Sequence, residues 1–411
     1  MTNLAVISIL FAVAAVFGWI SARWLKLPIT IGTMLLTVLT SMALMGTGIY
    51  APGIHSWAAA LSLQIDLRGV ILHGMLPLLL FAGSFLLDLE ELRKEKIAVT
   101  LLAVIGTVTS FFLVAELMGV LGGWRAPWIE YLLFGALISP TDPVAVLEML
   151  RRTRASKTTR AQLAGESLFN DGVGAVIFIT LLEAAQGTQP TVWSISETLA
   201  LKAGGGLLIG IAGAAFASHL MRRLTSYQVD ILITIALAFG GYAIAEVLHI
   251  SAPLEAVAAG IALRYFNRDQ PTEIVAHNSV HGFWSVIDEV QNSILFVLLG
   301  MAIMTVTLDK TSVREGTSAI LVVNAVRLVA VAALLGLLRL LQPTRRSSTL
   351  VLVWGGLRGG LSIALALSVP EELGRGWIVA ATYVVVVFSI VVQGGSLNWL
   401  LGWLSRTRPA A

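Results

Sequence analysis

The chain has 411 residues, of which 57% are hydrophobic and only 12% are charged, and its mean hydropathy is +0.86. A soluble domain normally carries about 25% charged residues, so this composition excludes an ordinary soluble protein and indicates one that lies in a lipid bilayer. The formal net charge is +3, and the cations lie mainly beside apolar runs, where they orient membrane helices, so we expect no nucleic-acid binding. The chain has no cysteine, which excludes disulfides and thiolate metal sites.

Apolar runs of the length that crosses a bilayer as a helix follow one another along the whole chain. They predict an all-α polytopic membrane protein with about thirteen spans, forming one transport domain over residues 1–411 without a soluble regulatory domain. The predicted spans are 4–22, 27–46, 69–88, 97–121, 127–150, 165–186, 197–219, 228–247, 251–265, 282–306, 317–338, 349–369 and 377–403.

The distribution of Lys and Arg predicts how these spans are oriented. We number each loop by the span that precedes it. Of the 27 Lys and Arg residues, nineteen lie in the odd-numbered loops and the C-terminal tail, and five lie in the even-numbered loops. Because cytoplasmic loops carry the excess of cations, we expect the N-terminus outside and the C-terminus in the cytoplasm. The expected location is the cell membrane, in a bacterium the inner membrane.

The fifth and twelfth predicted spans each contain a segment that disfavours a continuous helix. The fifth contains Ser139-Pro140-Thr141-Asp142-Pro143, whose two prolines remove amide donors and clash with the preceding turn. The twelfth contains four glycines around one cation, in Gly355-Gly356-Leu357-Arg358-Gly359-Gly360. Both helices are predicted to break there, with Asp142 compensating positive helix ends and Arg358 compensating negative ones.

The two broken spans are seven apart in order, so they cross the membrane in opposite directions, which is the geometry of an inverted repeat. Interrupted helices at corresponding positions of two halves are typical of a transporter that binds its substrate near the membrane midplane. The alternative is that each break is only a kink with a structural polar residue, because Pro and Gly are common in membrane helices.

The sixth span begins Gly165-Glu166-Ser167-Leu168-Phe169-Asn170-Asp171, which places two acids, an amide and a hydroxyl within its first two turns. Ser167 and Asp171 are four residues apart, as are Glu166 and Asn170, so oxygen ligands converge on neighbouring parts of one helix. Ionisable groups at this depth are costly and mark ion pathways. We expect Asp171 to hold either a proton or Na⁺, with competition between the two ions coupling their transport. The alternative is a helix cap near the membrane surface.

A second acid on this span is interpreted as structural. An unpaired buried charge is strongly destabilising, and Arg358 is the obvious intramembrane cation for Glu166. We therefore expect an ion pair between Glu166 and Arg358 that joins the sixth span to the twelfth. Arg327 lies near the middle of the eleventh span, where it is expected to have a carboxylate partner of its own.

Four segments carry a resemblance to a known family. They are LISPTDPVAVLEML at 137–150, GESLFNDGVGAV at 165–176, FWSVIDEVQNSILFVLLG at 283–300 and WGGLRGGLSIALALSVP at 354–370, with LLLFAGSFLLDLEELR at 78–93 as weaker support. Together they resemble the electroneutral branch of the cation:proton antiporter superfamily, the sodium/proton exchangers of the NhaP and NHE type.

The resemblance implies an antiporter that exchanges Na⁺ for H⁺, with Li⁺ or K⁺ as other candidate ions. It implies an ion-binding core of the fourth to sixth spans, at about 97–186, and the eleventh to thirteenth spans, at about 317–403. This core would move against a scaffold that dimerises, in an elevator-like cycle of alternating access. A homodimer in the bilayer is therefore expected, and neither a cofactor nor an enzymatic activity is.

The resemblance also assigns roles to residues. Asp171 is the expected ion carrier, with Ser167 and the Thr141 backbone as Na⁺ ligands. Glu166 is expected to act through water while pairing with Arg358, and Asp142 to compensate the broken-helix ends. Related electrogenic antiporters have Asp-Asp where this chain has Asn170-Asp171, which implies electroneutral 1:1 exchange. Asp288 and Glu289 resemble a family acidic pair, whereas Glu255 stands where the family usually has an apolar residue.

Two transport functions remain as alternatives to Na⁺/H⁺ exchange. A sodium-coupled solute symporter with a related inverted-repeat fold would need an organic-substrate pocket beside the ion site, and a K⁺/H⁺ antiporter would need a different cavity size. A passive channel is disfavoured, because a single carboxylate between two breaks is unlike a ring of carbonyls or repeated acids. An intramembrane hydrolase is also disfavoured, since the sequence contains no GxGD, HExxH or GxSxG motif.

Overall fold

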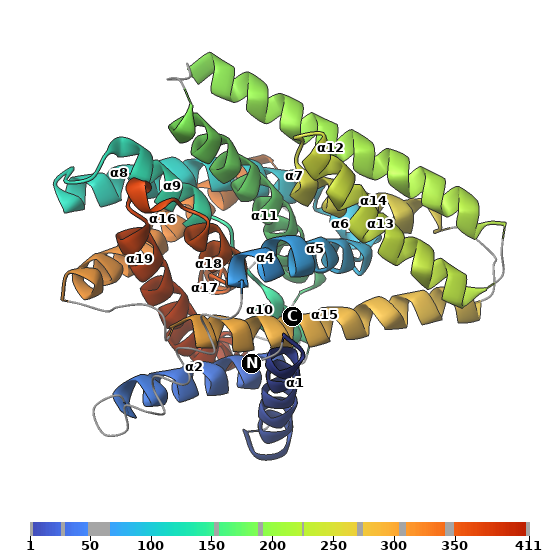
Figure 1. Cartoon of the computed structure of the whole chain (residues 1–411), viewed down its shortest axis with the longest axis horizontal. Coiled ribbons are helices and arrows are strands. Elements are labelled where there is room, and N and C mark those ends of the chain that lie inside the picture. The colour runs from blue at the N-terminus through green and yellow to red at the C-terminus, as the bar shows by residue number, and fades with distance from the viewer. Residues whose placement is uncertain are drawn as a thin grey trace.

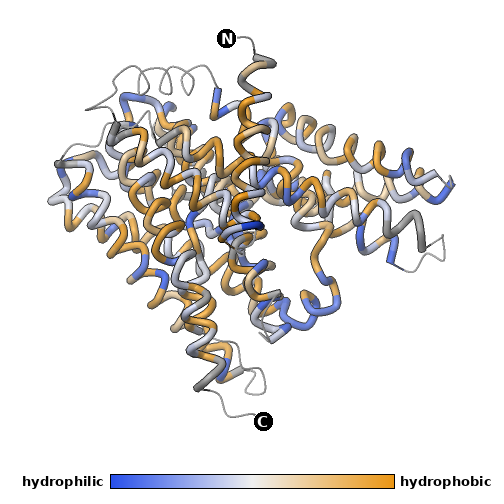
Figure 2. The backbone as a smooth tube through the Cα atoms, turned by 90° about the horizontal axis from the view of Figure 1, so that it is seen from below, coloured by the Kyte–Doolittle hydropathy of each residue, from blue (hydrophilic) through white to orange (hydrophobic). Residues whose placement is uncertain are grey.

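The computed structural model describes residues 3–25, 29–47, 66–151, 156–187, 192–223, 226–268, 274–303, 310–341 and 349–407. These residues are helical apart from turns and one isolated antiparallel bridge (Figure 1). Most of the residues along the helices are hydrophobic, and hydrophilic residues lie mainly at helix ends, with a few inside the bundle (Figure 2). The structure therefore confirms the predicted all-α fold.

The first half runs through α1 (Asn3–Ile20), η1 (Ser21–Leu25), α2 (Ile29–Thr47), α4 (Leu67–Gly69), η2 (Val70–Met75), α5 (Leu76–Phe85), α6 (Leu89–Lys94), α7 (Lys96–Thr100), η3 (Leu101–Gly106), α8 (Thr107–Gly122), α9 (Trp128–Ile138), α10 (Val144–Arg151) and α11 (Lys157–Gln186). The second half runs through α12 (Val192–Met221), α13 (Tyr227–Val247), α14 (Ala252–Phe266), α15 (Ile274–Ile303), α16 (Lys310–Leu341), α17 (Thr349–Trp354), α18 (Gly360–Leu367), η4 (Glu371–Leu373), α19 (Arg375–Phe388), η5 (Ser389–Gly394) and α20 (Gly395–Thr407).

Within the described ranges, each predicted span coincides with a helix or with a run of adjoining helical segments. Residues 27–28 and 304–306 of two predicted spans lie outside the described residues. In the described ranges, 9 helical stretches are long and apolar enough to cross a membrane, and two more, Ile29–Leu44 and Trp128–Ile138, are apolar but shorter. The chain is therefore a multi-pass membrane protein. The number of thirteen crossings stays a prediction.

Both predicted breaks are present, and they meet in space. The first separates α9 from α10 and the second separates α17 from α18. The amide N–H of Asp142 donates to the carbonyl oxygen of Leu357 at 2.8 Å, which forms the isolated bridge. Two extended segments thus cross between four short helices, at the place where Pro and Gly prevent continuous helices.

Glycine is needed at the crossing and beside it, because segments of the chain approach each other very closely there. A Cβ atom added to Gly359 would lie 2.3 Å from Asp142 Oδ2, and one added to Gly174 of α11 would lie 2.2 Å from Pro140 Cγ. Neither position has room for a methyl group unless Asp142 or Pro140 moves. The glycines of the second break therefore permit the contact as well as interrupting the helix.

Gly359→Ala is expected to destabilise the folded protein by about 1–3 kcal/mol, the usual cost of overpacking a filled interior. Gly336→Ala in α16 is the matched control, because no heavy atom lies within 4 Å of the added Cβ and alanine favours a helix. Thermal unfolding of both purified variants measures the difference. Equal melting temperatures for the two would contradict the close crossing.

Helices pack in two groups on either side of α11. On one side α14 packs against α5, α12 and α13, and on the other side α16 packs against α8 and α19 (Figure 1). α11 contacts both groups through α9, α12 and α14. It also carries the candidate ion carrier, so this residue lies at the junction of the two groups.

Candidate ion-binding site

A cavity of about 300 Å³ lies beside the crossed breaks. Its wall includes residues of α5, the first break and α10, α11, α15, and the start of α18. The acidic side chains that line it are Asp142, Glu148, Asp171, Asp288 and Glu289. Such a concentration of carboxylates in an apolar bundle attracts cations.

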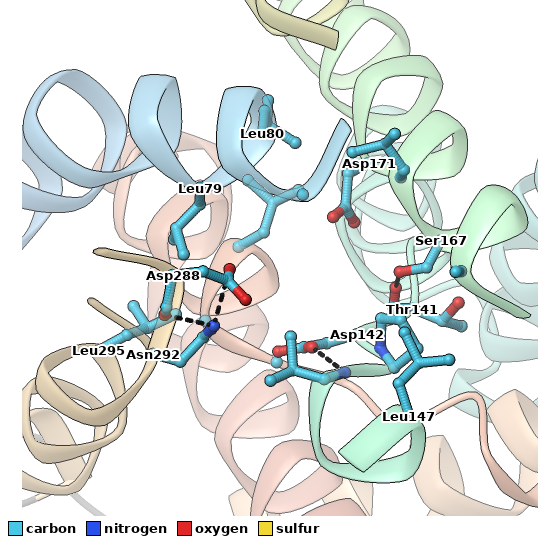
Figure 3. A pocket seen from close by; sticks show the side chains of 18 of the residues that line it. Leu79, Leu80, Thr141, Asp142, Leu147, Ser167, Asp171, Asp288, Asn292 and Leu295 are labelled. Atoms are coloured by element: carbon cyan, nitrogen blue, oxygen red, sulfur yellow. Dashed lines mark hydrogen bonds between the residues drawn. The ribbon is translucent and has the colours of Figure 1, made fainter. Parts of the chain in front are cut away.

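Asp171 projects from α11 into this cavity (Figure 3). Within the described ranges, no hydrogen bond or ion pair reaches its carboxylate. Both oxygens are therefore available to a proton or to a cation that enters the cavity. The side chain that the sequence predicts as the ion carrier therefore faces the cavity (Figure 3).

Thr141, in the first break, is held against α11 by two side chains. Ser167 Oγ donates a short hydrogen bond to the Thr141 carbonyl oxygen. Asn170 Nδ2 donates to Thr141 Oγ1 at 2.9 Å, and its Oδ1 accepts from the Thr141 amide at 3.3 Å. All three residues are buried. The break is thus fixed next to Asp171, and a carbonyl oxygen retains a second lone pair for a ligand.

The structure therefore brings Asp171, Ser167 and Thr141 together at one cavity. Asn170 and Glu166 do not line that cavity, and the Asn170 amide instead holds Thr141 in place. In the described part of the chain, no group of three or more His, Cys, Asp or Glu side chains could hold a metal ion as a resident cofactor.

Charged side chains stand at the ends of the broken helices. Asp142 Oδ1 accepts a hydrogen bond of 3.0 Å from the Val144 amide, at the positive N-terminal end of α10. Arg358 Nη1 donates to the carbonyl oxygens of Ser139, at 2.5 Å, and Pro140, at 2.7 Å, where α9 ends. The C-terminal carbonyls of a helix lack intrahelical partners, so the guanidinium supplies the missing donor.

The expected ion pair between Glu166 and Arg358 is wrong. Glu166 pairs instead with Arg327 of α16, whose Nη1 makes a short bond to Oε1 and whose Nη2 lies 3.0 Å from Oε2. Arg327 Nη2 also donates to the Leu352 carbonyl oxygen at 2.9 Å. The physical reason is that the Arg358 guanidinium is directed to the carbonyls at the end of α9. Arg327 does have the carboxylate partner that its central position suggested.

The wall opposite Asp171 contains a polar pair that sequence reasoning did not assemble. Asn292 Nδ2 donates to the Asp288 carbonyl oxygen at 2.8 Å and to Asp288 Oδ1 at 3.2 Å (Figure 3). Both residues line the cavity, as does Ser285. Their spacing of three and four residues along α15 is the signal that could have placed all of them on one helix face.

The fold and the site together define a class: a helical membrane transporter with two crossed, interrupted helices and a carboxylate beside the crossing. The family model described as sodium/hydrogen exchanger, transmembrane, matches residues 11–403. The chain therefore belongs to the sodium/hydrogen exchanger family.

Curated relatives and solved structures agree with this assignment. The chain is 35% identical to the Na⁺/H⁺ antiporter NhaP of Pseudomonas aeruginosa, over 99% of this chain and 98% of that protein. It is 31% identical to the Na⁺/H⁺ antiporter NhaH of Halobacillus dabanensis, over 81% of this chain and 83% of that one. The structure of the sodium proton antiporter MjNhaP1 from Methanocaldococcus jannaschii aligns with a TM-score of 0.72 at 18% identity, covering 96% of this chain and 100% of that chain. That likeness confirms the antiporter fold.

Proposed function

We propose that this chain is a secondary active antiporter that exchanges Na⁺ for H⁺ on the carboxylate of Asp171. The observation that carries the proposal is that this carboxylate faces a cavity beside two crossed breaks while no described side chain binds it. The relatives named as Na⁺/H⁺ antiporters favour Na⁺ over K⁺ as the exchanged cation. They also favour exchange over solute symport.

Competition for one site is sufficient to couple the two ions. Na⁺ would bind the Asp171 carboxylate together with Ser167 Oγ and the Thr141 backbone oxygen, since hard cations prefer oxygen ligands. A proton on Asp171 removes the negative charge that attracts Na⁺. With either ion bound the site is neutral, whereas the empty site carries a charge that is costly to move through the membrane interior. Only the loaded carrier therefore changes sides.

One carboxylate carrier per cycle makes the exchange 1:1 and electroneutral. The residue before Asp171 is Asn170, whose amide has no charge and is engaged with Thr141. Asp142 lies at the positive N-terminal end of α10 and Arg358 lies at the negative C-terminal end of α9, so we assign both residues to charge compensation. Glu166 is assigned to the ion pair with Arg327, which joins α11 to α16.

Alternating access requires one helix group to move against the other. We assign the core to spans four to six and eleven to thirteen, and the scaffold to the remaining spans, with homodimers forming through the scaffold. Support comes from the packing, because α8, α9, α16 and α19 form one group and α5, α12, α13 and α14 form another. We place the protein in the bacterial inner membrane. The distribution of Lys and Arg supports an orientation with the N-terminus outside and the C-terminus in the cytoplasm.

Wild-type protein in liposomes with a trapped pH dye tests the proposal. Adding Na⁺ under an imposed proton gradient is expected to drive H⁺ movement. Li⁺ is expected to drive less H⁺ movement than Na⁺, and K⁺ the least. Clamping the membrane potential at different values is expected to leave the response to Na⁺ unchanged. Voltage-dependent flux would contradict 1:1 exchange while keeping antiport. Flux with K⁺ alone would indicate a K⁺/H⁺ antiporter. Without any cation-dependent H⁺ flux, the sodium-coupled symporter would be the better explanation.

A further inference from the structure

Glu255 is a buried acid that the proposed exchange does not use. It lies in the first turn of α14, where Ser251 Oγ caps the helix by accepting a hydrogen bond of 3.2 Å from the Leu254 amide. Its side chain is 0% exposed, and it is absent from the lining of the cavity that contains Asp171. The helices packed around α14 are α5, α11, α12 and α13.

Three glycines bring α12 and α13 into close contact with the turn that carries Glu255. A Cβ atom on Gly241 of α13 would lie 2.0 Å from Glu255 Oε1. On α12, a Cβ on Gly206 would lie 2.3 Å from the Ser251 carbonyl oxygen, and one on Gly210 would lie 2.4 Å from the Glu255 carbonyl oxygen. Small residues allow membrane helices to approach in this way. The turn that carries Glu255 is therefore packed closely against α12 and α13, and its carboxyl group lies against Gly241.

Neither oxygen of the Glu255 carboxyl group has a hydrogen-bond partner in the part of the chain that the structure describes. The nearby cation of α12, Lys202, is directed elsewhere, since its Nζ lies 2.5 Å from Glu183 Oε2. The other titratable groups on the packed helices are Lys157, Arg160, Glu166, Asp171 and Glu183 of α11, Glu197 and His219 of α12, and Tyr227, Asp230, Tyr242 and Glu246 of α13. α5 contributes none. Within the described ranges, none of these groups binds the Glu255 carboxyl oxygens, so no cation pairs with an ionised Glu255 there.

An ionised carboxylate that is buried without a partner costs far more free energy than a neutral carboxylic acid. A cation in its place would need several further oxygen ligands, and the glycines around Glu255 have no side chain to provide them. We propose that Glu255 is a second proton-binding site, separate from Asp171, and that its proton keeps α12, α13 and α14 packed together. The ligand is a proton that is held and not exchanged for Na⁺.

A line of ionisable groups leads from this site to the surface. Tyr242 follows Gly241 on α13, and Glu246 lies one helical turn further along the same helix. Glu246 in turn pairs with His73 Nδ1 at 2.8 Å, and both of these side chains are exposed.

Infrared difference spectroscopy of the full-length protein in lipid tests for the proton directly. Glu255→Gln is expected to lose one carbonyl band of a protonated carboxylic acid at neutral pH, and Asp171→Asn is expected to keep it. Na⁺ should leave this band in place while removing any band that belongs to Asp171. A Glu255→Gln spectrum equal to that of the wild type would overturn the proposal. Because the band is independent of transport, it separates this proposal from the proposed exchange.

Wild-type protein labelled with ¹³C at the glutamate side-chain carboxyl is the second arm, in case the substitution prevents folding. The same band is expected to move to lower frequency, and an unmoved band would overturn the assignment to a glutamate.

Packing is tested with Gly241→Ala, which is expected to lower the melting temperature, against Gly240→Ala, whose Cβ has no heavy atom within 4 Å. Adding Glu255→Ala is expected to restore the melting temperature of Gly241→Ala. Failure to restore it would contradict the placement of the carboxyl group against Gly241.

Discussion

Asp171→Asn is expected to abolish Na⁺-dependent H⁺ movement, reducing it to the level of protein-free liposomes. Asparagine has nearly the shape of aspartate but neither binds a proton in this pH range nor offers a negative charge to Na⁺. The side chain that faces the cavity would thus lose both ligands of the proposed exchange at once. Reconstituted protein with a trapped pH dye measures the loss.

A thermal-shift measurement separates lost binding from lost folding. Na⁺ that binds only the folded protein stabilises it by about 2.7 kcal/mol at a concentration of 100 times the dissociation constant. This gain is expected for the wild type and absent in Asp171→Asn, whose melting temperature without Na⁺ should be at least that of the wild type, because a buried charge has been removed. Retained exchange in the folded variant would remove Asp171 from the mechanism.

Asp288→Asn is the matched control, because this second acid lines the same cavity from the opposite wall (Figure 3). Its carboxylate raises the local cation concentration without being the proposed carrier, and such focusing weakens at high ionic strength. We expect the variant to keep exchange, with a weaker apparent affinity for Na⁺ that approaches the wild-type value in high salt. Equal, complete losses in both variants would mean that the two acids form one site.

Features encoded locally were predictable from the sequence. Pro140 and Pro143 predict the first break and the glycines around Arg358 predict the second, because each acts on its own turn of helix. The four-residue spacing of Ser167 and Asp171 predicts that they lie on one helix face, and both residues line the cavity from α11. The all-helical membrane fold followed from composition and apolar length. Hydropathy alone predicts a span less clearly where its helix is broken, because each half is shorter than a membrane crossing: α9 has 11 residues and α10 has 8.

Features that depend on the packing of distant spans were not predictable. Two arginines lie inside spans, and the sequence does not encode which of them approaches Glu166, 161 residues from Arg327. The role of Asn170 was also hidden, because its amide is occupied by a residue 29 positions away. Asp288 and Asn292 form a wall of the cavity only because α15 packs across from α11. Helix orientation in three dimensions decides each of these contacts.

Arg327→Met is expected to lower the free energy of unfolding by about 3–5 kcal/mol, the usual cost of leaving one partner of a buried ion pair. Glu166 is 1% exposed and has no room to regain water, and the Leu352 carbonyl oxygen near the end of α17 would also lose its donor. Glu166→Gln should be milder, because glutamine still accepts from the arginine. Thermal or denaturant unfolding of purified protein measures both changes.

The double variant Glu166→Gln with Arg327→Met is expected to recover part of the loss seen for Arg327→Met, because neither charge of this ion pair remains. Recovery should be incomplete, since the Leu352 carbonyl oxygen still lacks its donor. Arg358→Gln is the discriminating comparison. Its guanidinium binds the carbonyls of Ser139 and Pro140, so adding Glu166→Gln should not recover its loss. Recovery there, without any in the Arg327 series, would place Glu166 beside Arg358 and contradict the pairing in the structure.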